Sequence, residues 1–450
     1  MAELSAQLIN KLKLNEGKPS FKRNFEHKIL PFFTRNPERA KFSQGFDPVI
    51  GALSRISIGW NPVYLKDEYT IEDIAENIDS VQLINGEEMD EDEKVRFLSN
   101  MFDQSYIKAF NHPYLLNYYA VSENNEKKGE IDIAKYLCRI FDLNNHNEWK
   151  QFINDRSTSN LVEDLLIDSL GEMNSTEVDN NFVVISEDIL RERFEDLSYL
   201  LKHKDFAIKN MSLFFAFYYF QFLMQTVLKV DRLNINDDRV FELYYTLDSE
   251  KITSTRITNK SGFNLLKKTY KNIQANDNLI GYLNELIESN EFHSIQDIKN
   301  MEDNRKEYLN AEFKEFLDKY KVSTDRNEIL PSDLESKISM FRDWLVKDLP
   351  SETVSRFPKP IEEIGDLYFL KRRGQLGKVL TLRKELIILL TALIVKDKKM
   401  IIRDVFVEFE KRGVFLDRYS KEEIIELYER MNILDKKSDS GEAKYVKPIL

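Results

Sequence analysis

The spacing of hydrophobic residues is most regular near the C-terminus. Apolar residues that recur every three or four positions share one face of a helix, because the helix turns once about every 3.6 residues. This spacing predicts a helix from residue 381 onward, built on Leu382, Leu386, Leu389, Leu390 and Leu393. A second helix is predicted over residues 402–412, and Gly413 supplies its C-terminal stop.

A third helix and a hairpin follow. Ser420 and Glu423 stand at the spacing of a capping box, before the apolar residues Ile424, Ile425, Tyr428 and Met431. Residues 433–437 and 443–446 are predicted to be strands, and the turn-forming residues 438–441 join them. Two helices, a capped helix and a hairpin are the order of a winged helix-turn-helix domain.

The pattern between residues 63 and 330 is mainly helical. Pro113 is the only proline there, and prolines interrupt helices. Residues 213–224 are apolar on nearly all sides and predict the helix around which the body packs. Residues 240–260 are rich in β-branched and aromatic residues and predict a short strand or hairpin. Helical spacing covers residues 70–78, 91–102, 105–118, 131–141, 161–170, 186–201, 206–228, 263–273, 279–289 and 304–320.

Prolines and glycines divide the chain. Residues 1–65 hold five of the eleven prolines, which disfavours long helices there, and residues 347–365 hold Pro350, Pro358 and Pro360. The predicted fold class is therefore mainly α, a multi-helix body with a C-terminal winged helix-turn-helix domain. The predicted parts are an irregular basic and aromatic N-terminal segment over 1–65, an acidic helical body over 66–346, a linker over 347–365 and the winged domain over 366–450.

Aromatic and basic residues alternate in the N-terminal segment. Between residues 21 and 60 they include Phe25, Phe32, Phe33, Phe42, Phe46 and Trp60, with Lys22, Arg23, Lys28, Arg35, Arg39, Lys41 and Arg55. Such a mixture can form a platform for nucleic acid. It can equally be an irregular segment whose rings anchor it to the next domain, and we favour this second interpretation.

Charge separates the C-terminus from the rest. Residues 371–450 hold 19 Lys and Arg against 13 Asp and Glu, a net charge of +6, whereas the whole chain carries −12 and residues 66–370 carry −23. A basic module binds phosphates, and an acidic body repels them and is better suited to protein partners. We expect the third helix, the hairpin and the residues that precede the module to contact double-stranded DNA. The residues expected to do so are Lys371, Arg372, Arg373, Arg418, Lys421, Arg430, Lys436, Lys437 and Lys444.

The composition indicates a cytoplasmic protein. Cys138 is the only cysteine, which suits a reducing compartment and excludes disulfides and multi-cysteine zinc sites. The first residues lack the basic and apolar pattern of an export signal. Residues 210–228 lack charge but contain several polar residues, so we interpret them as a buried helix rather than a membrane span.

Catalytic and cofactor motifs are absent from the sequence. There is no dinucleotide-binding fingerprint or phosphate-binding loop, since Gly374, Gly377 and Lys378 lack the required spacing and the Ser or Thr. The five histidines are too far apart for a helix-borne metal pair, and the acid-x-Lys pairs lie in helical patterns. We expect no catalytic residue, metal or cofactor.

Three short motifs carry a resemblance to a known family. They are Arg372-Arg373-Gly374-Gln375-Leu376-Gly377 before Leu380-Thr381-Leu382, then Arg412-Gly413 with Asp417 and Ser420, and Ser438-Asp439-Ser440-Gly441 with Ala443, Tyr445 and Val446. In these the last eighty residues resemble the DptG family, the restriction proteins of DNA phosphorothioation-dependent defence systems in bacteria. The resemblance implies a subunit of a complex that acts on DNA lacking the sulfur modification, with an ATPase or helicase-like component and the cleavage machinery on partner subunits.

The sequence therefore favours a non-catalytic, DNA-binding or scaffold subunit of such a restriction complex. Three alternatives remain open. The winged domain can be a protein–protein adaptor without DNA contact, because the fold alone does not imply DNA binding. The chain can also be a transcriptional regulator, or a nuclease whose site is assembled from distant residues.

Overall fold

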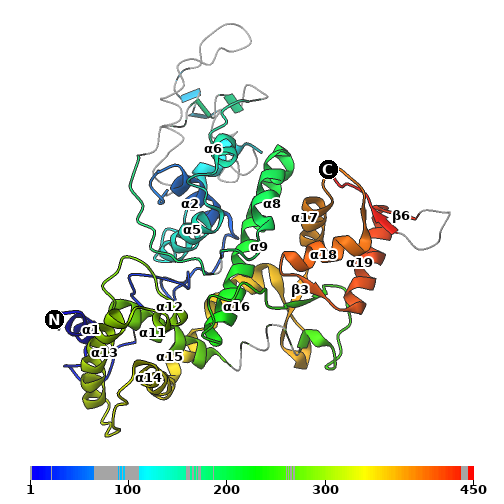
Figure 1. Cartoon of the computed structure of the whole chain (residues 1–450). Helices are drawn as coiled ribbons and strands as arrows, with labels where there is room; N and C mark the ends of the chain where they lie inside the picture. Colours follow the sequence, from blue (N-terminus) through cyan, green and yellow to red (C-terminus); the bar gives the residue numbers. More distant parts are fainter. Residues whose placement is uncertain are drawn as a thin grey trace.

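A mainly helical architecture is seen in the computed structural model (Figure 1), as the hydrophobic pattern predicts. The structure describes residues 3–21, 23–64, 111–158, 174–185, 187–259, 269–436 and 444–450, with isolated residues between these ranges. The helix predicted over residues 70–78 lies outside the described residues, as do parts of the helices predicted over 91–102, 105–118 and 161–170. The end of the segment 105–118 is a 3₁₀ helix, η2 (Pro113–Tyr118).

Helix α9 (Lys204–Asp231) is the centre of the molecule, as predicted. It contacts helices from both halves of the chain (Figure 1). Its residues from Phe214 to Val230 are all buried, because large apolar side chains point in every direction. The helix is long and apolar enough to cross a membrane, but 89% of its most hydrophobic stretch is buried inside the protein. The described residues therefore give no clear membrane signal, and α9 has the burial of a core helix.

The N-terminal segment forms part of this core. It contains α1 (Glu3–Lys11), which packs on α13 (Asp303–Ser323), and α2 (Asp47–Ser57), which packs on α5 (Lys127–Phe141). Phe25, Phe32, Phe42 and Phe46 are all buried. The aromatic residues thus anchor the segment to the body, as the favoured interpretation holds.

Between α9 and β2 the described residues form six α-helices. Part of the helix predicted over 263–273 lies outside the described residues. Its end and the start of the helix predicted over 279–289 belong to one helix, α11 (Tyr270–Glu285), which does not break at residues 274–278, four of which are polar. Asp277 there is buried and pairs with Arg23 at 2.5 Å, and Asn276 accepts a hydrogen bond from Arg342 at 2.7 Å. Distant partners thus keep the polar stretch helical. The others in this part are α12 (Ile295–Lys299), α13, α14 (Leu334–Asp348), α15 (Ser351–Arg356) and α16 (Lys359–Ile364).

The segment predicted as a linker is folded. Residues 347–365 include α15 and α16, and Phe357, Ile361 and Ile364 are fully buried. Pro350 and Pro358 stand at helix N-caps and Pro360 in a first turn, where a missing N–H costs little. The prolines therefore begin short helices here and do not keep the chain extended. The proposed domain boundaries themselves stay predictions.

A four-stranded sheet joins the body to the C-terminal part. Its order is β2 (Leu370–Arg372), β3 (Lys378–Leu382), β1 (Tyr244–Leu247) and β5 (Phe415–Leu416), and β1 runs parallel to both of its neighbours. The strand predicted within 240–260 is thereby confirmed. The helix predicted from residue 381 begins later, as α17 (Lys384–Val395), because Thr381 and Leu382 pair with β1.

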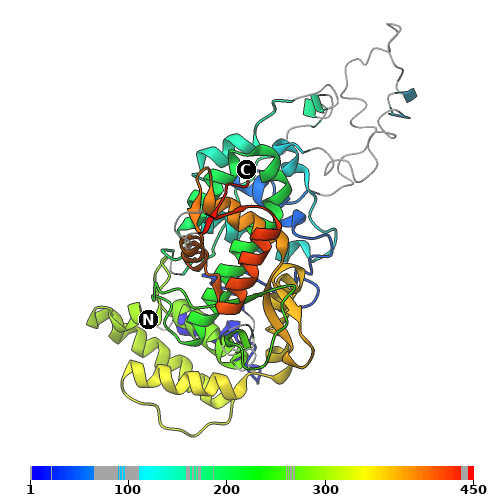
Figure 2. The same cartoon turned by 90° about the vertical axis from the view of Figure 1, so that its right-hand side faces the viewer.

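The remaining C-terminal elements match the predicted order. They are β4 (Met400–Ile401), α18 (Ile402–Lys411), α19 (Arg418–Arg430), β6 (Leu434–Lys436) and β7 (Lys444–Val446), and Figure 2 turns this part toward the viewer. Strands β4, β7 and β6 form an antiparallel sheet in that order. Residues 437–443, which include the predicted turn, lie outside the described residues.

The capping box predicted at Ser420 is wrong. Helix α19 begins at Arg418, and its N-cap is Asp417, whose side chain accepts a hydrogen bond from the Ser420 backbone N–H at 3.0 Å. Ser420 is fully buried one turn into the helix. Its hydroxyl lies 2.8 Å from a Glu250 carboxylate oxygen and 3.1 Å from the Tyr245 carbonyl oxygen. Contact with the body therefore fixes the start of α19.

Candidate nucleic-acid interface

Two arginine contacts hold the C-terminal elements against the body. Arg412, just after α18, is 2% exposed and donates two hydrogen bonds to Asp196 of α8 (Glu192–Leu201), at 2.7 and 2.6 Å. Tyr218 of α9 donates to the same carboxylate at 2.6 Å. Burial alone would lower the pKa of Arg412, but the charge and hydrogen bonds of Asp196 outweigh burial and raise that pKa.

The second contact lies at the start of α19. Arg256 donates to both carboxylate oxygens of Asp417, at 2.5 and 2.6 Å, and to Glu250 at 3.0 Å. Its guanidinium also lies 4.8 Å from the ring centre of Tyr419. Burial opposes the charge of Arg256, but the hydrogen bonds to the two carboxylates raise its pKa. The first turn of α19 is thereby tied to the loop that follows β1.

Two of the three bases predicted around residue 372 are bound within the protein. The Lys371 ammonium lies 2.5 Å from the Asp248 carboxylate, and its hydrogen bond lowers the pKa of Asp248. Arg373 donates to the carbonyl oxygens of Leu247 and Asp248 at 2.8 and 3.0 Å. Arg372 alone of the three is exposed. Lys371 and Arg373 thus join β2 to the end of β1, and Arg372 is the base presented to solvent.

The predicted bases of α19 occupy its two ends and one side. Arg418 is 86% exposed and pairs with Glu422 at 2.9 Å. Lys421 is half-buried, pairs with Glu410 at 3.1 Å and lies 5.5 Å from the ring centre of Phe406. Arg430 is exposed at the C-terminal end of the helix. The structure does not bring these three bases together.

Acidic residues occupy much of the solvent side of α19. Glu422, Glu426 and Glu429 are exposed, and Glu423 is half-buried. The helix holds four glutamates against three bases. A surface of this sign repels phosphates, so α19 is a poor match for the DNA backbone along its middle.

The remaining predicted lysines lie on or next to paired strands of the β4-β7-β6 sheet. Lys436 and Lys444 are opposite each other in the register of β6 and β7. Lys444 pairs with Glu429 at 3.4 Å, and Lys447 pairs with Asp435 at 3.4 Å. Lys437, the remaining predicted base, lies outside the described residues.

Three lysines of this group were missed by the sequence interpretation. Lys398 and Lys399 precede β4, which pairs with β7, and Lys447 follows β7. Lys398 is exposed, and Lys399 pairs with Asp435. The signal in the sequence is the adjacent pair Lys398-Lys399 before Met400 and Ile401, but only the strand pairing places it beside the hairpin. We call Lys398, Lys399, Lys436, Lys444 and Lys447 the sheet lysines.

Catalytic groups are not assembled among the described residues. No three His, Cys, Asp or Glu residues there are grouped so that they could hold a metal ion. Cys138 is buried, and burial raises the pKa of its thiol to about 12, so its thiolate is not populated near neutral pH. The described residues thus offer neither a metal centre nor an activated cysteine.

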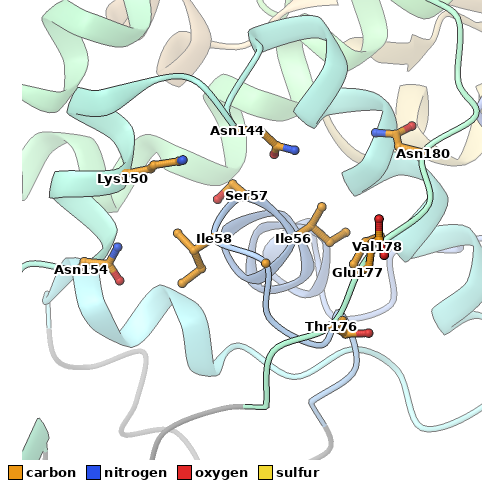
Figure 3. Close-up of a pocket in the computed structure, with 11 residues that line it drawn as sticks. Ile56, Ser57, Ile58, Asn144, Lys150, Asn154, Thr176, Glu177, Val178 and Asn180 are labelled. Atoms are coloured by element: carbon orange, nitrogen blue, oxygen red, sulfur yellow. The ribbon is translucent and has the colours of Figure 1, made fainter.

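A surface cleft of about 550 Å³ lies between the end of α2, the middle and C-terminal end of α6 (Asn147–Ile153) and residues 176–180 (Figure 3). Several of its polar side chains form hydrogen bonds within the fold. The Ser57 hydroxyl accepts from Trp149 at 2.8 Å and donates to the Ser54 carbonyl oxygen at 2.7 Å. Asn180 donates to the Lys135 carbonyl oxygen at 2.8 Å. These groups form no arrangement of nucleophile and base.

No protein-family model matches the chain, and no curated protein matches it.

Proposed function

We propose that this protein is a DNA-binding and scaffold subunit, without catalytic activity of its own, of a bacterial phosphorothioation-dependent restriction complex in the cytoplasm. The observation that carries the DNA-binding part is the gathering of the sheet lysines on one small antiparallel sheet beside α19. The sequence motifs that resemble the DptG family carry the assignment to a restriction complex. The partner subunits then supply the ATPase or helicase-like activity and the cleavage.

The order of elements supports a winged helix-turn-helix domain. Helices α17, α18 and α19 are followed by the β6 and β7 strands of a hairpin, and β4 lies between the first two helices and pairs with β7. In domains of this type the third helix and the hairpin are the elements that contact DNA. The hairpin is then the wing.

Charge favours a contact led by the wing. The sheet lysines lie within three residues of β4, β6 or β7, whereas glutamates cover the solvent side of α19. Phosphates attract lysines whatever the base sequence, so such a contact positions the protein without reading the sequence strongly. Arg418 and Arg430, at the two ends of α19, and exposed Arg372 add charge at the margins.

The rest of the chain suits protein partners. Residues 66–370 carry a net charge of −23, which opposes contact with DNA. The sheet that contains β1 and the buried Arg412–Asp196 pair join this body to the C-terminal elements. A partner on the body and DNA on the wing would therefore be held by one continuous structure.

The acidic side of α19 favours a second candidate function. A helix whose exposed residues include Glu422, Glu426 and Glu429 can bind a basic surface of another protein. In that case the winged domain is a protein–protein adaptor, and the complex contacts DNA through another subunit.

Binding of the full-length protein to labelled duplex DNA at several salt concentrations separates the two functions. The full chain is required, because β1 from the body completes the sheet. The DNA-binding function predicts that log K falls linearly with log salt, by about 0.9 for each phosphate contact. Absence of binding at low salt would reject it and favour the adaptor. A single preferred sequence bound far above random DNA would indicate a regulator instead.

Purification from a bacterium that carries the phosphorothioation system tests the complex. The proposal predicts that the protein elutes with an ATPase or helicase-like subunit, and that the assembled complex cleaves unmodified DNA but spares sulfur-modified DNA. The isolated protein should not cleave DNA with Mg²⁺ or Mn²⁺. Cleavage by the isolated protein would show it to be the nuclease.

A further inference from the structure

A second candidate site lies far from the sheet lysines in the sequence. A cavity of about 420 Å³ opens between the N-terminal residues 21–38 and α11, with α5 and α15 at its edges. This volume is in the range of small-molecule sites, which are mainly apolar and contain a few polar groups. None of the residues that line this cavity belongs to the wing strands or to the sheet lysines.

Two aromatic rings of the cavity lack the contacts that hold the others. Phe25 and Phe32 are buried and pack edge-on against Tyr282 and Phe357. Phe21 and Phe33 also line the cavity, but they are half-buried and neither contacts another ring among the described residues. A half-buried ring without a partner offers a face on which a flat heterocycle can stack.

Two hydrogen-bond acceptors in the cavity wall are unused. Gln274 is 1% exposed, and its side-chain oxygen accepts no hydrogen bond from the described residues. The Oε2 atom of Glu38 is also buried without a donor, while its Oε1 atom pairs with Arg35 at 3.2 Å. Leaving buried polar atoms unpaired costs free energy, so both oxygens suit a ligand that brings N–H groups.

The charges of the lining favour an anion. Arg23, Lys28, Arg35 and Arg356 line the cavity with Glu38, Asp132 and Asp277, four cations against three carboxylates. Arg23 pairs with Asp277, Lys28 pairs with Asp132 at 3.7 Å, and Arg35 pairs with Glu38. Arg356 is therefore the surplus cation of the lining. Arg356 is 55% exposed and pairs with an exposed glutamate, Glu352, at 3.3 Å. Such an arginine can exchange that partner for a phosphate.

We propose that this cavity binds a nucleotide. The base stacks on Phe21 or Phe33 and donates N–H groups to Gln274 and Glu38, and the phosphate lies against Arg356 and Arg35. A cationic amine would also use the rings and acceptors, but the surplus of cations disfavours it. The proposal is independent of the DNA-binding function.

Calorimetric titration of the full-length protein with AMP, GMP, CMP and UMP tests the site. We expect at least one nucleotide to bind, and its nucleoside to bind more weakly. Gln274→Leu removes the acceptor at similar size and should weaken binding of that nucleotide about tenfold or more. Arg356→Ala should weaken binding of the nucleotide but not of the nucleoside. Matched controls are Gln296→Leu and Arg191→Ala, which change exposed residues outside the cavity and should leave binding unchanged.

Several outcomes would overturn the proposal. These are the absence of binding by all four nucleotides, equal binding by inorganic phosphate, tighter binding by spermidine, or affinities that neither variant changes. If Gln274→Leu fails to fold, as circular dichroism would show, the effect of Arg356→Ala on nucleotide and nucleoside decides the question. Loss of DNA binding would not bear on this site, and its failure would leave the wing unaffected.

Discussion

The guanidinium of Arg412 and the carboxylate of Asp196 form a two-point ion pair in the interior, with exposed fractions of 2% and 0%. They are separated by 216 positions in the sequence, and Tyr218 of the central helix donates to the same carboxylate. Because Asp196 does not reach water, its charge depends on Arg412 for compensation, while Arg412 also pairs with Glu408 at 2.8 Å. This pair connects α8 of the body to the end of α18.

Asp196→Ala is expected to destabilise the protein by about 3 kcal/mol, because it removes the fully buried carboxylate that pairs with Arg412 and leaves only the partly exposed Glu408, at 2.8 Å, as a counter-charge. Urea unfolding followed by circular dichroism measures the change. Asp188→Ala is the matched control, because Asp188 pairs with Arg191 at an exposed site, where such pairs contribute about 1 kcal/mol or less.

The double variant Asp196→Leu with Arg412→Met checks the explanation. It removes both charges, so it should be more stable than either single variant. A double variant as unstable as the sum of the two single changes would show that packing, and not charge, determines the effect.

Asp417→Ala should loosen the first turn of α19. The change removes the N-cap, which contributes about 0.5–2 kcal/mol, and leaves Arg256 without its closest carboxylate. Hydrogen exchange should become faster at residues 419–421 than at residues 426–430. Asp333→Ala, which removes the N-cap of α14 without breaking a buried ion pair, is the control and should cost less. If the two variants lost equal stability, the ion pair between Arg256 and Asp417 would add nothing beyond the N-cap.

The raised pKa of the buried Glu130 carboxyl leads us to expect that the stability of the protein depends on pH. Burial is the main cause that raises the pKa of this carboxyl above its usual value, in spite of hydrogen bonds from Ser122. The folded state therefore binds the proton more tightly than the unfolded state. The contribution of Glu130 to the free energy of unfolding is fully present at pH values below the pKa of this carboxyl in the unfolded state. It is lost as the pH rises through the pKa of the same carboxyl in the folded state. Relative to Glu130→Gln, the natural protein should gain stability as the pH falls from 7 toward the usual carboxyl range. Parallel pH profiles would contradict this.

Replacement of lysines should separate DNA contacts from structural contacts. Lys398→Ala with Lys436→Ala is expected to reduce the slope of log K against log salt by about 0.9 for each lost phosphate contact. Lys371→Ala should leave the slope unchanged, because that lysine pairs with Asp248. Fluorescence anisotropy with one labelled duplex measures all three proteins. If only Lys371→Ala changed the slope, the result would indicate that DNA contacts the β2–β3 region and not the wing.

Local periodicity was enough to predict several elements. Helix α18, most of α19 and the central helix α9 follow from apolar residues at helical spacing, and the β6 and β7 strands follow from turn residues between β-branched or aromatic ones. In these elements the side chains that decide the structure are neighbours in the chain.

Distant partners explain what the sequence did not reveal. The cap of α19 moves from Ser420 to Asp417 because Arg256, 161 positions earlier, holds that carboxylate. Thr381 and Leu382 are in a strand because β1 pairs with them. The charge count likewise could not separate Lys371, bound to Asp248 at a distance of 123 positions, from exposed Lys398.

The central position of β1 has a consequence for the order of synthesis and folding. Thr246 of β1 pairs with Thr381 of β3, and its hydroxyl donates a hydrogen bond to the carbonyl oxygen of Leu380, 134 positions later. A ribosome releases β1 long before β3 and β5 exist, so both edges of β1 stay open during this interval. Open strand edges invite association with other chains. A chain truncated before residue 370 would retain that open strand permanently, and we expect it to aggregate or to require a chaperone.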